Sequence, residues 1–395
     1  MTLTREQLLK DLHQAYLDAR RHKRQKPYQQ RFEKHAEENL ERLCDELYSR
    51  TYSPGVSACF IIRDPKQREV FAAQFRDRIV HHLYYNYVHV MMERTFIADS
   101  YSCIPKRGTH YGIDRLDRHI RQESQNYTER CYVMKMDISG YFMHISRRKL
   151  LSITLRQLRH MAGHRVAPDS RDTWSDRVDM DFTLHNPLTN CMRRGKATDW
   201  IGLPREKSLF YSPEGCGLPI GNLTSQLFSN IYLNELDQYI KRTLRCRHYG
   251  RYVDDFYIVS CDQEWLLSLR RPIADFVEKH LGLSLNDGKT IVAEARRGVE
   301  FLGAYVKPRR RYVSNHTLRR MEKKIPLLKL CETAEMLRST LNSMLGLLQH
   351  YRSYNIRHRL FYRLDYIYAY GHYKSGLRRF VLTSRIRISL STNHR

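Results

Sequence analysis

The sequence has no long hydrophobic run. No stretch of it approaches the roughly 18 to 20 consecutive apolar side chains of a membrane-spanning helix, so we predict no transmembrane segment and no membrane partner. Residues 1–6 also lack the apolar stretch that is typical of a signal peptide. We therefore expect the protein to stay in the cytoplasm, where it is made.

Paired cysteines are also missing. The nine cysteines are odd in number and scattered between Cys44 and Cys331, and no two are spaced as Cys-x-x-Cys. This pattern argues against both a zinc ribbon and a disulfide framework. Reduced, mostly buried thiols fit the sequence best.

Acidic residues are scarce. The 42 Asp and Glu against 68 Lys and Arg leave a formal charge of +26, and residues 296–395 hold 22 basic and 5 acidic residues, or +17 of that total. Such a one-sided field suits a phosphate backbone, with an affinity that falls steeply as salt rises. A well-solvated basic surface is the alternative. The 42% hydrophobic and 11% aromatic content excludes a disordered chain.

Hydrophobic spacing predicts a mixture of helices and strands. A Thr4 to Gln7 capping pair followed by leucines at helical spacing predicts helix over the first fifty residues, and a stripe repeated every four residues from Phe228 to Leu244 predicts another long helix. The chain from Lys307 onward should be helical and basic, with most of its many tyrosines in the core. The other expected elements are strands at 58–62, 132–136, 249–260 (two), 291–292 and 301–302, and helices at 69–93 and 272–280.

The segment 161–215 differs in composition from the rest of the chain. Five aspartates between Asp169 and Asp181, together with four prolines, predict a polar and irregular insert exposed to solvent. The aspartate spacing lacks the glycine and the terminal glutamate of a calcium-binding loop.

Three aspartates stand where rigid elements are expected to end. Asp137 follows the strand at 132–136, and Asp254 and Asp255 occupy the turn of the hairpin at 249–260. If a sheet brings them together, their charge needs cations, and oxygen ligands with room for phosphate oxygens select Mg²⁺. Two such ions serve in-line phosphoryl transfer, with Mn²⁺ as the alternative metal. An ordinary surface turn is the other interpretation of an Asp-Asp pair.

Five short motifs follow one another in a recognisable order. They are MDISGYF at 136–142, GLPIGNLTSQ at 217–226, YVDD at 252–255, NDGKT at 286–290 and VEFLG at 299–303. Together they resemble four palm motifs and the primer grip of reverse transcriptases, over residues 60–306. The resemblance implies an α+β right-hand polymerase with fingers, a ferredoxin-like palm whose β-hairpin carries the aspartate pair, and a helical thumb. The implied boundaries are an N-terminal helical extension at 1–55, fingers at 56–130, palm at 131–160 and 216–306, an insertion at 161–215 and a basic thumb at 307–395.

The resemblance also implies catalytic roles. Asp137 and Asp254 match the principal ligands of two Mg²⁺ ions, with Asp255 beside them and the Ile138 carbonyl as a further oxygen. Lys289 matches a lysine that protonates the departing pyrophosphate or holds it by charge. The implied reaction is RNA-directed DNA synthesis from dNTPs.

Further residues match positions that bind the incoming nucleotide. Tyr141 matches an aromatic steric gate against the ribose 2′-hydroxyl, although Phe142 is only one residue away and core packing is the alternative for this pair. The basic members of the set flank a turn, where a solvated basic loop is the alternative. The full set is Arg63, Lys66, Arg68, Tyr141, Ile220, Gly221 and Gln226.

Ile220 replaces a glutamine that retroviral and group II intron enzymes usually have before the glycine matched by Gly221. The motif resembles the diversity-generating retroelement branch, which implies error-prone copying at template adenines. An antiphage-defence enzyme that copies a dedicated noncoding RNA or primes on protein is the alternative, and a catalytically inactive nucleic-acid-binding scaffold is a third interpretation.

Template-primer contacts are implied for the C-terminal part. The matching residues are Phe301, Leu302 and Gly303 of the primer grip and Arg309, Arg310, Arg319 and Arg320 of the thumb. Expected partners are an RNA template, its cDNA or primer duplex, and dNTPs, with a dedicated noncoding RNA and an accessory protein as further candidates. No second acidic constellation for an RNase H domain and no endonuclease signature is found in the sequence.

Overall fold

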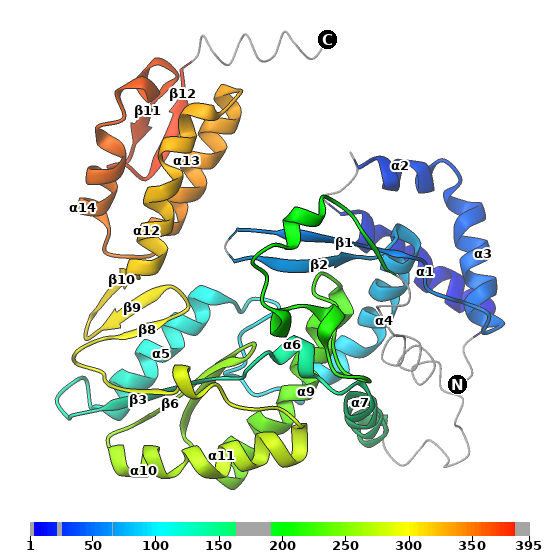
Figure 1. Ribbon diagram of the computed structural model, residues 1–395, viewed down its shortest axis with the longest axis horizontal. Coiled ribbons are helices and arrows are strands. Elements are labelled where there is room, and N and C mark those ends of the chain that lie inside the picture. The colour runs from blue at the N-terminus through cyan, green and yellow to red at the C-terminus, as the bar shows by residue number, and fades with distance from the viewer. Residues whose placement is uncertain (1–3, 22–25, 65, 163–190, 384–395) are drawn as a thin grey trace. The chain divides into compact units, whose positions relative to one another are not determined.

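The computed structural model describes residues 4–21, 26–64, 66–162 and 191–383 (Figure 1). The chain divides into two compact units, which we describe separately. The first comprises residues 1–106, 135–256 and 268–290, and the second comprises residues 107–134, 257–267 and 291–395. The five aspartates predicted to lie in a solvated insert fall outside the described residues.

Four helices build the N-terminal part of the first unit. They are α1 (Arg5–Arg20), α2 (Pro27–Glu33), α3 (Ala36–Tyr48) and α4 (Phe75–Glu93). The predicted cap is confirmed, since Thr4 Oγ1 accepts a hydrogen bond from the Gln7 amide at 3.2 Å. Leu8 and Leu12 of α1 are buried in one hydrophobic core with residues of α3 and α4, which confirms the predicted amphipathic helix.

A small sheet follows these helices in the first unit. Its strands β1 (Ser57–Ile62), β2 (Arg68–Ala72) and β4 (Cys191–Arg193) lie in the order β2-β1-β4, with β1 antiparallel to β2 and parallel to β4. The helix predicted from residue 69 is therefore wrong over its first residues. Glu69, Phe71 and Ala73 are buried in alternation, which is the period of a strand.

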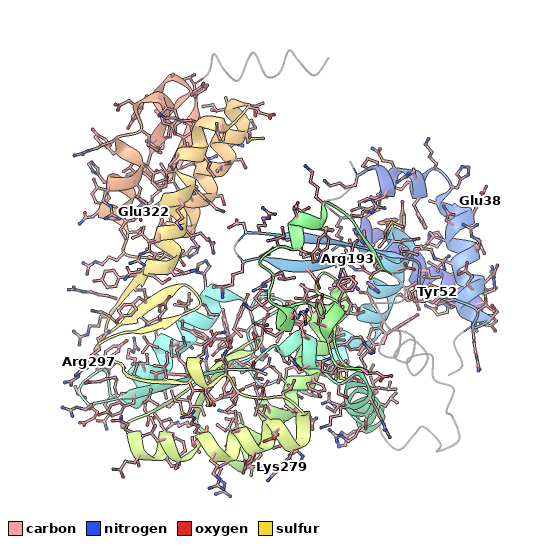
Figure 2. The ribbon with its side chains drawn as sticks, in the orientation of Figure 1. Glu38, Tyr52, Arg193, Lys279, Arg297 and Glu322 are labelled. Carbon is pink, nitrogen blue, oxygen red and sulfur yellow. The ribbon has the colours of Figure 1, made fainter. Side chains whose placement is uncertain are left out.

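Residues 191–215 are polar and turn-rich, as predicted, yet they are anchored to this sheet. The buried Glu69 carboxylate accepts hydrogen bonds from Trp200 Nε1 at 3.0 Å, Ser208 Oγ at 2.7 Å and the Leu209 amide at 2.8 Å. Arg193 lies with its guanidinium 4.1 Å from the centre of the Phe210 ring (Figure 2). The boundaries proposed for the insertion and the other domains remain predictions.

A four-stranded sheet has the order β5-β6-β3-β7, and the chain passes from one unit to the other within β3 and within β6. The strands are β3 (Tyr132–Asp137), β5 (His248–Tyr252), β6 (Asp255–Ser260) and β7 (Ile291–Glu294). The predicted hairpin and the strand that ends at Asp137 are both confirmed. Helices α6 (Tyr141–His144), α7 (Arg147–Ala162), α9 (Leu223–Gln238) and α11 (Arg270–Phe276) belong to the first unit.

The stripe predicted from Phe228 to Leu244 is confirmed for most of its length. Its first four members are buried, and Leu244 is only partly buried. Helix α9 ends at Gln238 and continues as a wider turn over Tyr239–Thr243, which rotates the last member away from the four-residue spacing.

The second unit is less helical than predicted. Its helices are α5 (Thr109–Glu123), α10 (Gln263–Ser268, whose last residue falls in the first unit), α12 (Asn315–Lys324), α13 (Ala334–Gln349) and α14 (Tyr354–Arg357). Strands β8 (Val299–Phe301), β9 (Ala304–Lys307) and β10 (Arg310–Val313) form an antiparallel sheet, and β11 (Gly371–Lys374) pairs with β12 (Arg379–Leu382). The helical prediction from Lys307 is thus wrong at β10 and at this last hairpin.

Most of the tyrosines after Lys307 were expected in the core, and that expectation is wrong, since Tyr354, Tyr362, Tyr368 and Tyr370 are exposed. Tyr351 is buried, whereas Tyr354 and Tyr362 are more than half exposed. All nine cysteines are free thiols, and four of them are buried. Among the described helices, none combines the length and the apolar character needed to cross a membrane.

Candidate active site

The turn between β5 and β6 carries the aspartate pair. Val253, at the start of this turn, has a φ of 56°, a left-handed conformation that costs a β-branched residue on the order of 1 to 3 kcal/mol. Two hydrogen bonds hold the turn: Arg251 Nη1 donates to the Val253 carbonyl at 2.9 Å, and the Ile138 amide donates to the Asp254 carbonyl at 3.3 Å. The strained turn is therefore held by a side chain of β5 and by the backbone that follows β3.

A buried ion pair supports this turn. Arg251 and Asp237 are both 0% exposed, and the guanidinium bonds the carboxylate twice, through Nε at 2.7 Å and Nη2 at 2.6 Å. Tyr249 donates its hydroxyl to the same carboxylate at 2.6 Å. Sequence reasoning missed this network. Its only signal was an arginine in the middle of an apolar strand, which requires a buried partner.

Asp137 lies at the end of β3, as predicted, and contacts the fourth motif. Lys289 Nζ lies 2.6 Å from Asp137 Oδ2, with the lysine side chain 57% exposed and the aspartate side chain 13% exposed. The Asn286 amide donates to the Asp137 carbonyl at 2.8 Å. The backbone thus positions Lys289 beside Asp137, a contact that the sequence did not predict.

The three carboxylates share one electrostatic environment. Burial, reinforced by the negative charge of Asp137, raises the pKa of Asp254 to about 6. Burial also raises the pKa of Asp255 to about 6, against the opposing charge of Lys135 and with the help of the other two aspartates. A raised pKa means that the ionised carboxylate is disfavoured at this place, and a bound cation would reduce that cost.

These side chains fit a divalent cation by their chemistry. Carboxylate oxygens are the hard ligands that Mg²⁺ and Mn²⁺ prefer, and the raised pKa values of Asp254 and Asp255 indicate a site short of positive charge. Within the described ranges, no three His, Cys, Asp or Glu side chains are arranged as a ready set of ligands. The ammonium of Lys289 is the cation that Asp137 contacts here.

The second motif lies against β2 and the first motif. Gly221 has a φ of 121°, and a Cβ there would come within 2.6 Å of the Phe71 carbonyl, so only glycine fits. The Phe71 amide donates to the Ile220 carbonyl at 2.7 Å, and the Leu218 amide donates to the Phe142 carbonyl at 2.8 Å. Gln226, on the first turns of α9, is exposed.

The predicted gate residue Tyr141 is a core residue. It is 2% exposed, and its hydroxyl donates to the Ser229 carbonyl at 2.7 Å. Its neighbour Phe142 is only partly buried, and it packs with Ile220 against a cluster formed by Cys59, Phe71, Met143 and Leu209, which we call the Phe71 cluster. Gly140, with a left-handed φ of 54°, is the N-cap of α6, which begins at the buried Tyr141.

The three basic residues near the first sheet differ in their surroundings. Arg68 is close enough to Asp254 for its charge to oppose the rise in the pKa of that aspartate. Arg63, instead, pairs with Asp199 at 3.2 Å, and Lys66 is exposed. Of the three, Arg68 is therefore the one that the structure brings to the carboxylates.

The residues matched to the primer grip and thumb lie in the second unit. Phe301 is buried against Tyr257, with the ring centres 5.1 Å apart. Leu302 and Gly303 both have positive φ values and form the tight turn between β8 and β9. Arg309, Arg310 and Arg319 are exposed and Arg320 is half-buried.

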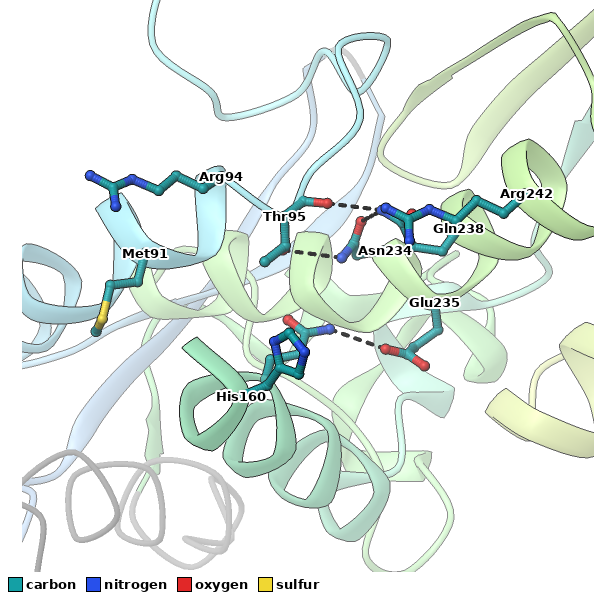
Figure 3. Close-up of a pocket in the computed structure, with 9 residues that line it drawn as sticks. Met91, Arg94, Thr95, His160, Asn234, Glu235, Gln238 and Arg242 are labelled. Atoms are coloured by element: carbon teal, nitrogen blue, oxygen red, sulfur yellow. Dashed lines mark hydrogen bonds between the residues drawn. The ribbon is translucent and has the colours of Figure 1, made fainter. Parts of the chain in front are cut away.

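A hollow of about 660 Å³ lies among α4, α7 and α9, away from the residues predicted from the motifs (Figure 3). Its polar side chains bond to one another: Asn234 Nδ2 donates to Thr95 Oγ1 at 3.2 Å and Gln238 Nε2 donates to the Thr95 carbonyl at 2.9 Å. Glu235 pairs with Arg156 at 2.6 Å. The polar side chains of this hollow connect the helices around it, and its carboxylate, that of Glu235, is engaged in an ion pair.

Part of the chain matches a known protein family. Residues 173–306 match the family described as reverse transcriptase (RNA-dependent DNA polymerase). This segment of the chain is similar to a reverse transcriptase domain. This match includes the second motif, the aspartate turn, Lys289 and the primer grip, and it begins after Asp137.

Individual relatives are more distant. The chain is 26% identical to Protein YkfC of Escherichia coli (strain K12) over 308 residues, which cover 69% of this chain and 72% of that protein. Telomerase from Candida albicans, solved in complex with a fragment of telomeric RNA, is similar with a TM-score of 0.46 and 10% identity over 80% of this chain. Apo telomerase from Candida tropicalis is similar with a TM-score of 0.44 and 11% identity over 82% of this chain. The chain spans 55% and 64% of those two telomerase chains.

Proposed function

We propose that this chain is an RNA-directed DNA polymerase that copies an RNA template into cDNA by nucleotidyl transfer. The observation that carries the proposal is the meeting of Asp137, Asp254 and Lys289 at the strained β5–β6 turn of a chain with a reverse transcriptase domain. A surface turn would have no need of a buried ion pair beneath it, of raised pKa values or of a lysine held at its edge. An inactive scaffold would not need them either.

The proposed chemistry divides among these side chains. Asp137, Asp254 and Asp255 would hold two Mg²⁺ ions, or Mn²⁺ in their place, with the Ile138 carbonyl as a further oxygen. When bound, such ions lower the pKa of an attacking hydroxyl and neutralise phosphate charge. Lys289, more than half exposed beside Asp137, would hold a proton for the departing pyrophosphate or attract it by charge.

Nucleotide selection is proposed for the residues around the Phe71 cluster. Phe142, the partly exposed aromatic, takes over the gate role first assigned to Tyr141, because the Tyr141 ring is buried and its hydroxyl is bonded. Arg68 would contact the triphosphate, with Arg63 and Lys66 further out on the loop. Gly221, Ile220 and Gln226 would border the same nucleotide.

Template and primer are proposed partners of the second unit. Phe301, Leu302 and Gly303 would form the primer grip, and Arg309, Arg310, Arg319 and Arg320 would neutralise backbone phosphates. The right-hand arrangement of fingers, palm and thumb and a cytoplasmic location belong to the same proposal.

The packing of Ile220 favours one biological role, which is error-prone copying in a diversity-generating retroelement. Ile220 packs its side chain against the Phe71 cluster and offers no hydrogen bond beside a nucleotide, so checking of the base pair would be relaxed. Replacing Ile220 with glutamine is expected to lower the misincorporation rate opposite template adenine. An unchanged error spectrum would count against this role.

Primer extension on an RNA template tests the proposal. The double variant Asp254→Ala, Asp255→Ala is expected to lose at least about a thousandfold in rate, the scale on which dismantling an electrostatic centre acts. Glu264→Ala removes an exposed carboxylate from α10 and should leave the rate unchanged. Extension by the double variant at the wild-type rate would overturn the assignment.

A further inference from the structure

A groove in the first unit has no assigned role. It lies among helices α2, α3 and α4 and strands β1 and β2, and has a volume of about 800 Å³. Among the described residues that line it, five are arginines and none is an aspartate or a glutamate. Sites for small molecules usually measure roughly 300 to 1,000 Å³ and combine an apolar lining with a few polar groups. The groove has the size and the mixed lining of such a site.

The floor of the groove is one face of the small sheet. Ala58 and Ala72 are paired across β1 and β2, and Phe60 lies on the same side of β1, because alternate residues of a strand share a face. All three line the groove. Cys59 and Phe71, the next pair in the register, point to the opposite face and belong to the Phe71 cluster. The sheet thus packs on that cluster with one face and borders the groove with the other.

The groove is distinct from the site proposed for the dNTP. Phe142 and Ile220 pack on the Phe71 cluster, on the other face of the sheet. Arg68 begins β2 and Ala72 ends it, so a rise of about 3.3 Å per residue puts their backbones about 13 Å apart. A ligand in the groove would therefore contact other side chains than those proposed for the dNTP.

One wall of the groove holds a guanidinium in a fixed position beside aromatic rings. Tyr28 and Phe32 of α2 line the groove and pack partly buried against the N-terminal helices. The Arg78 guanidinium lies 5.0 Å from the centre of the Tyr28 ring. Its Nη1 donates to the Tyr28 hydroxyl at 2.9 Å, and its Nε donates to the Ala73 carbonyl at 2.9 Å. Arg78 is thus held in place before any ligand binds.

Four of the five arginines have no carboxylate partner. The fifth, Arg76, pairs with Glu46. No ion pair joins a described aspartate or glutamate to the other four, which are Arg31, Arg42, Arg78 and Arg194. Charge of one sign therefore gathers around the groove.

The acidic residues closest to the groove in the sequence are engaged elsewhere. Each aspartate and glutamate of α2 and α3 contacts a basic side chain other than those four. The pairs are Glu33 with Arg20, Glu37 with His13, Glu38 with His35, Glu41 and Asp45 with Arg5, and Glu46 with Arg76. Asp199, five residues after Arg194, pairs with Arg63 at 3.2 Å. The positive charge of the groove remains for a ligand.

The lining indicates the chemistry of that ligand. A guanidinium matches phosphate oxygens with two parallel hydrogen bonds. Four guanidiniums without carboxylates favour an anion with several charges over a monoanion such as a fatty acid. The flat apolar floor beside Tyr28 and Phe32 suits an aromatic ring. A nucleoside triphosphate combines the ring and the charges in one small molecule.

We propose that this groove binds a free nucleoside triphosphate, with the base on the floor formed by Ala58, Phe60 and Ala72 and the phosphates at the arginines. The site is additional to the dNTP position of the proposed reaction and does not depend on that reaction. The 5′-triphosphate end of an RNA has the same chemistry, and the experiment separates these two sources.

Titration of the full chain with a fluorescent ATP tests the proposal. The probe carries its fluorophore on the ribose, and EDTA is present so that no metal ion contributes to binding. Arg31→Gln with Arg78→Gln should weaken binding at least about tenfold, because charge-assisted hydrogen bonds to phosphate are lost. The matched double variant Lys10→Gln with Lys34→Gln removes the same charge from exposed positions outside the groove, and should cost about twofold or less. Equal losses in the two double variants would overturn the proposal.

Filling the floor tests the position of the base without changing any charge. Ala58→Leu extends a partly buried side chain into the groove and should weaken ATP binding about tenfold. Thermal unfolding without ligand shows whether the variant is folded, and Ala72→Leu on the paired strand gives the same test if it is not. A folded variant of either kind with wild-type affinity would refute the proposal.

Competition against the fluorescent ATP identifies the ligand. Adenosine lacks the phosphates and inorganic tripolyphosphate lacks the base, so each should compete at least about tenfold more weakly than ATP. Equal competition by either one would overturn the combined assignment. An RNA of about 20 nucleotides with a 5′-triphosphate should compete no better than ATP. Stronger competition by this RNA, lost in the Arg31, Arg78 variant, would assign the groove to an RNA end and overturn the proposal.

The same probe separates this site from the proposed polymerase site. The Asp254→Ala, Asp255→Ala variant should bind ATP in EDTA as wild type does, and the Arg31, Arg78 variant should keep its KM for dNTP. Loss of ATP binding in the aspartate variant would place the probe at the aspartates and overturn the proposal. A wild-type protein that binds ATP through the groove yet incorporates no dNTP would refute the proposed function instead.

Discussion

At Asp254 and Asp255, burial and neighbouring negative charge act in the same direction. A carboxyl group whose pKa is higher in the folded state binds its proton more tightly there than in the unfolded chain. The folded state therefore loses stability as the pH rises from about 4, the unfolded value, to about 6. Above that range these two residues destabilise the protein until a cation joins them.

Removing one of these charges should stabilise the metal-free protein. In EDTA at pH 7.5 we expect Asp254→Asn to be more stable than wild type by on the order of 1 to 3 kcal/mol, with the difference narrowing toward pH 4.5. Urea denaturation at the two pH values measures this, with Glu264→Gln as the control. Equal stability at pH 7.5 would show that the carboxylates are not crowded as described.

The two aromatic residues of the first motif should have separate effects. Phe142→Ala is expected to improve the use of ribonucleotides relative to deoxynucleotides by at least about tenfold, since it removes the partly exposed ring. Tyr141→Phe loses the hydrogen bond to Ser229 and should cost about 1 kcal/mol in stability without changing this ratio. The ratio of kcat/KM for ribonucleotides to that for deoxynucleotides, measured in both variants, shows which residue acts as the gate. A change in Tyr141→Phe alone would return the gate role to Tyr141.

At the scale of elements, the β5–β6 hairpin depends on a charge pair that no local pattern predicts. Arg251 and Asp237 are 14 residues apart in the sequence and belong to different elements, yet both are fully buried beneath the turn. A buried pair is costly to break, because the remaining charge has no partner.

Breaking this pair should destabilise the protein strongly. Asp237→Asn is expected to cost about 3 kcal/mol or more in urea denaturation, and Arg251→Met a similar amount. The double variant Asp237→Asn, Arg251→Met should cost less than the sum of the two single variants, because it leaves no unpaired charge. Additive costs would mean that the two side chains do not act as a pair.

Removing the buried Glu69 carboxylate should loosen residues 191–215, which it anchors to β2. Glu69→Ala leaves three donors without an acceptor, two of them on the buried residues Ser208 and Leu209, so the segment should detach more readily from β2. Tryptic cleavage after the exposed Arg205 or Lys207 should become at least about tenfold faster. Glu264→Ala serves as the control, and an unchanged cleavage rate in Glu69→Ala would contradict the role of this anchor.

These elements also show what the sequence could predict. The α1 cap, the strand ending at Asp137 and the β5–β6 hairpin follow from neighbouring residues alone, and all three were predicted correctly. Strand β2 was mistaken for helix, because the carboxylate of Glu69 is buried by donors more than 130 residues away. The burial of Tyr141 and its hydrogen bond to the Ser229 carbonyl, 88 residues away, are contacts that spacing does not reveal.

At the scale of the whole molecule, the formal charge of +26 and the three aspartates favour ligands of opposite charge. The basic residues suit a nucleic acid, while the aspartates suit the cation that brings a phosphate to them. The family match covers residues 173–306, so the role of Asp137 depends on its contacts with Lys289 and Asn286. The net charge alone predicts a polyanionic partner. The reaction proposed for that partner rests on the geometry of the carboxylates.

Template-directed addition of a single nucleotide tests the central claim most directly. Wild-type protein is mixed with a DNA primer annealed to an RNA template, one dNTP at a time, with Mg²⁺ or with EDTA. The account predicts that only the complementary dNTP is added, that EDTA abolishes the addition, and that Asp254→Asn slows it at least about a thousandfold. Addition that ignores the template or persists in EDTA, or a fully active Asp254→Asn, would contradict the account.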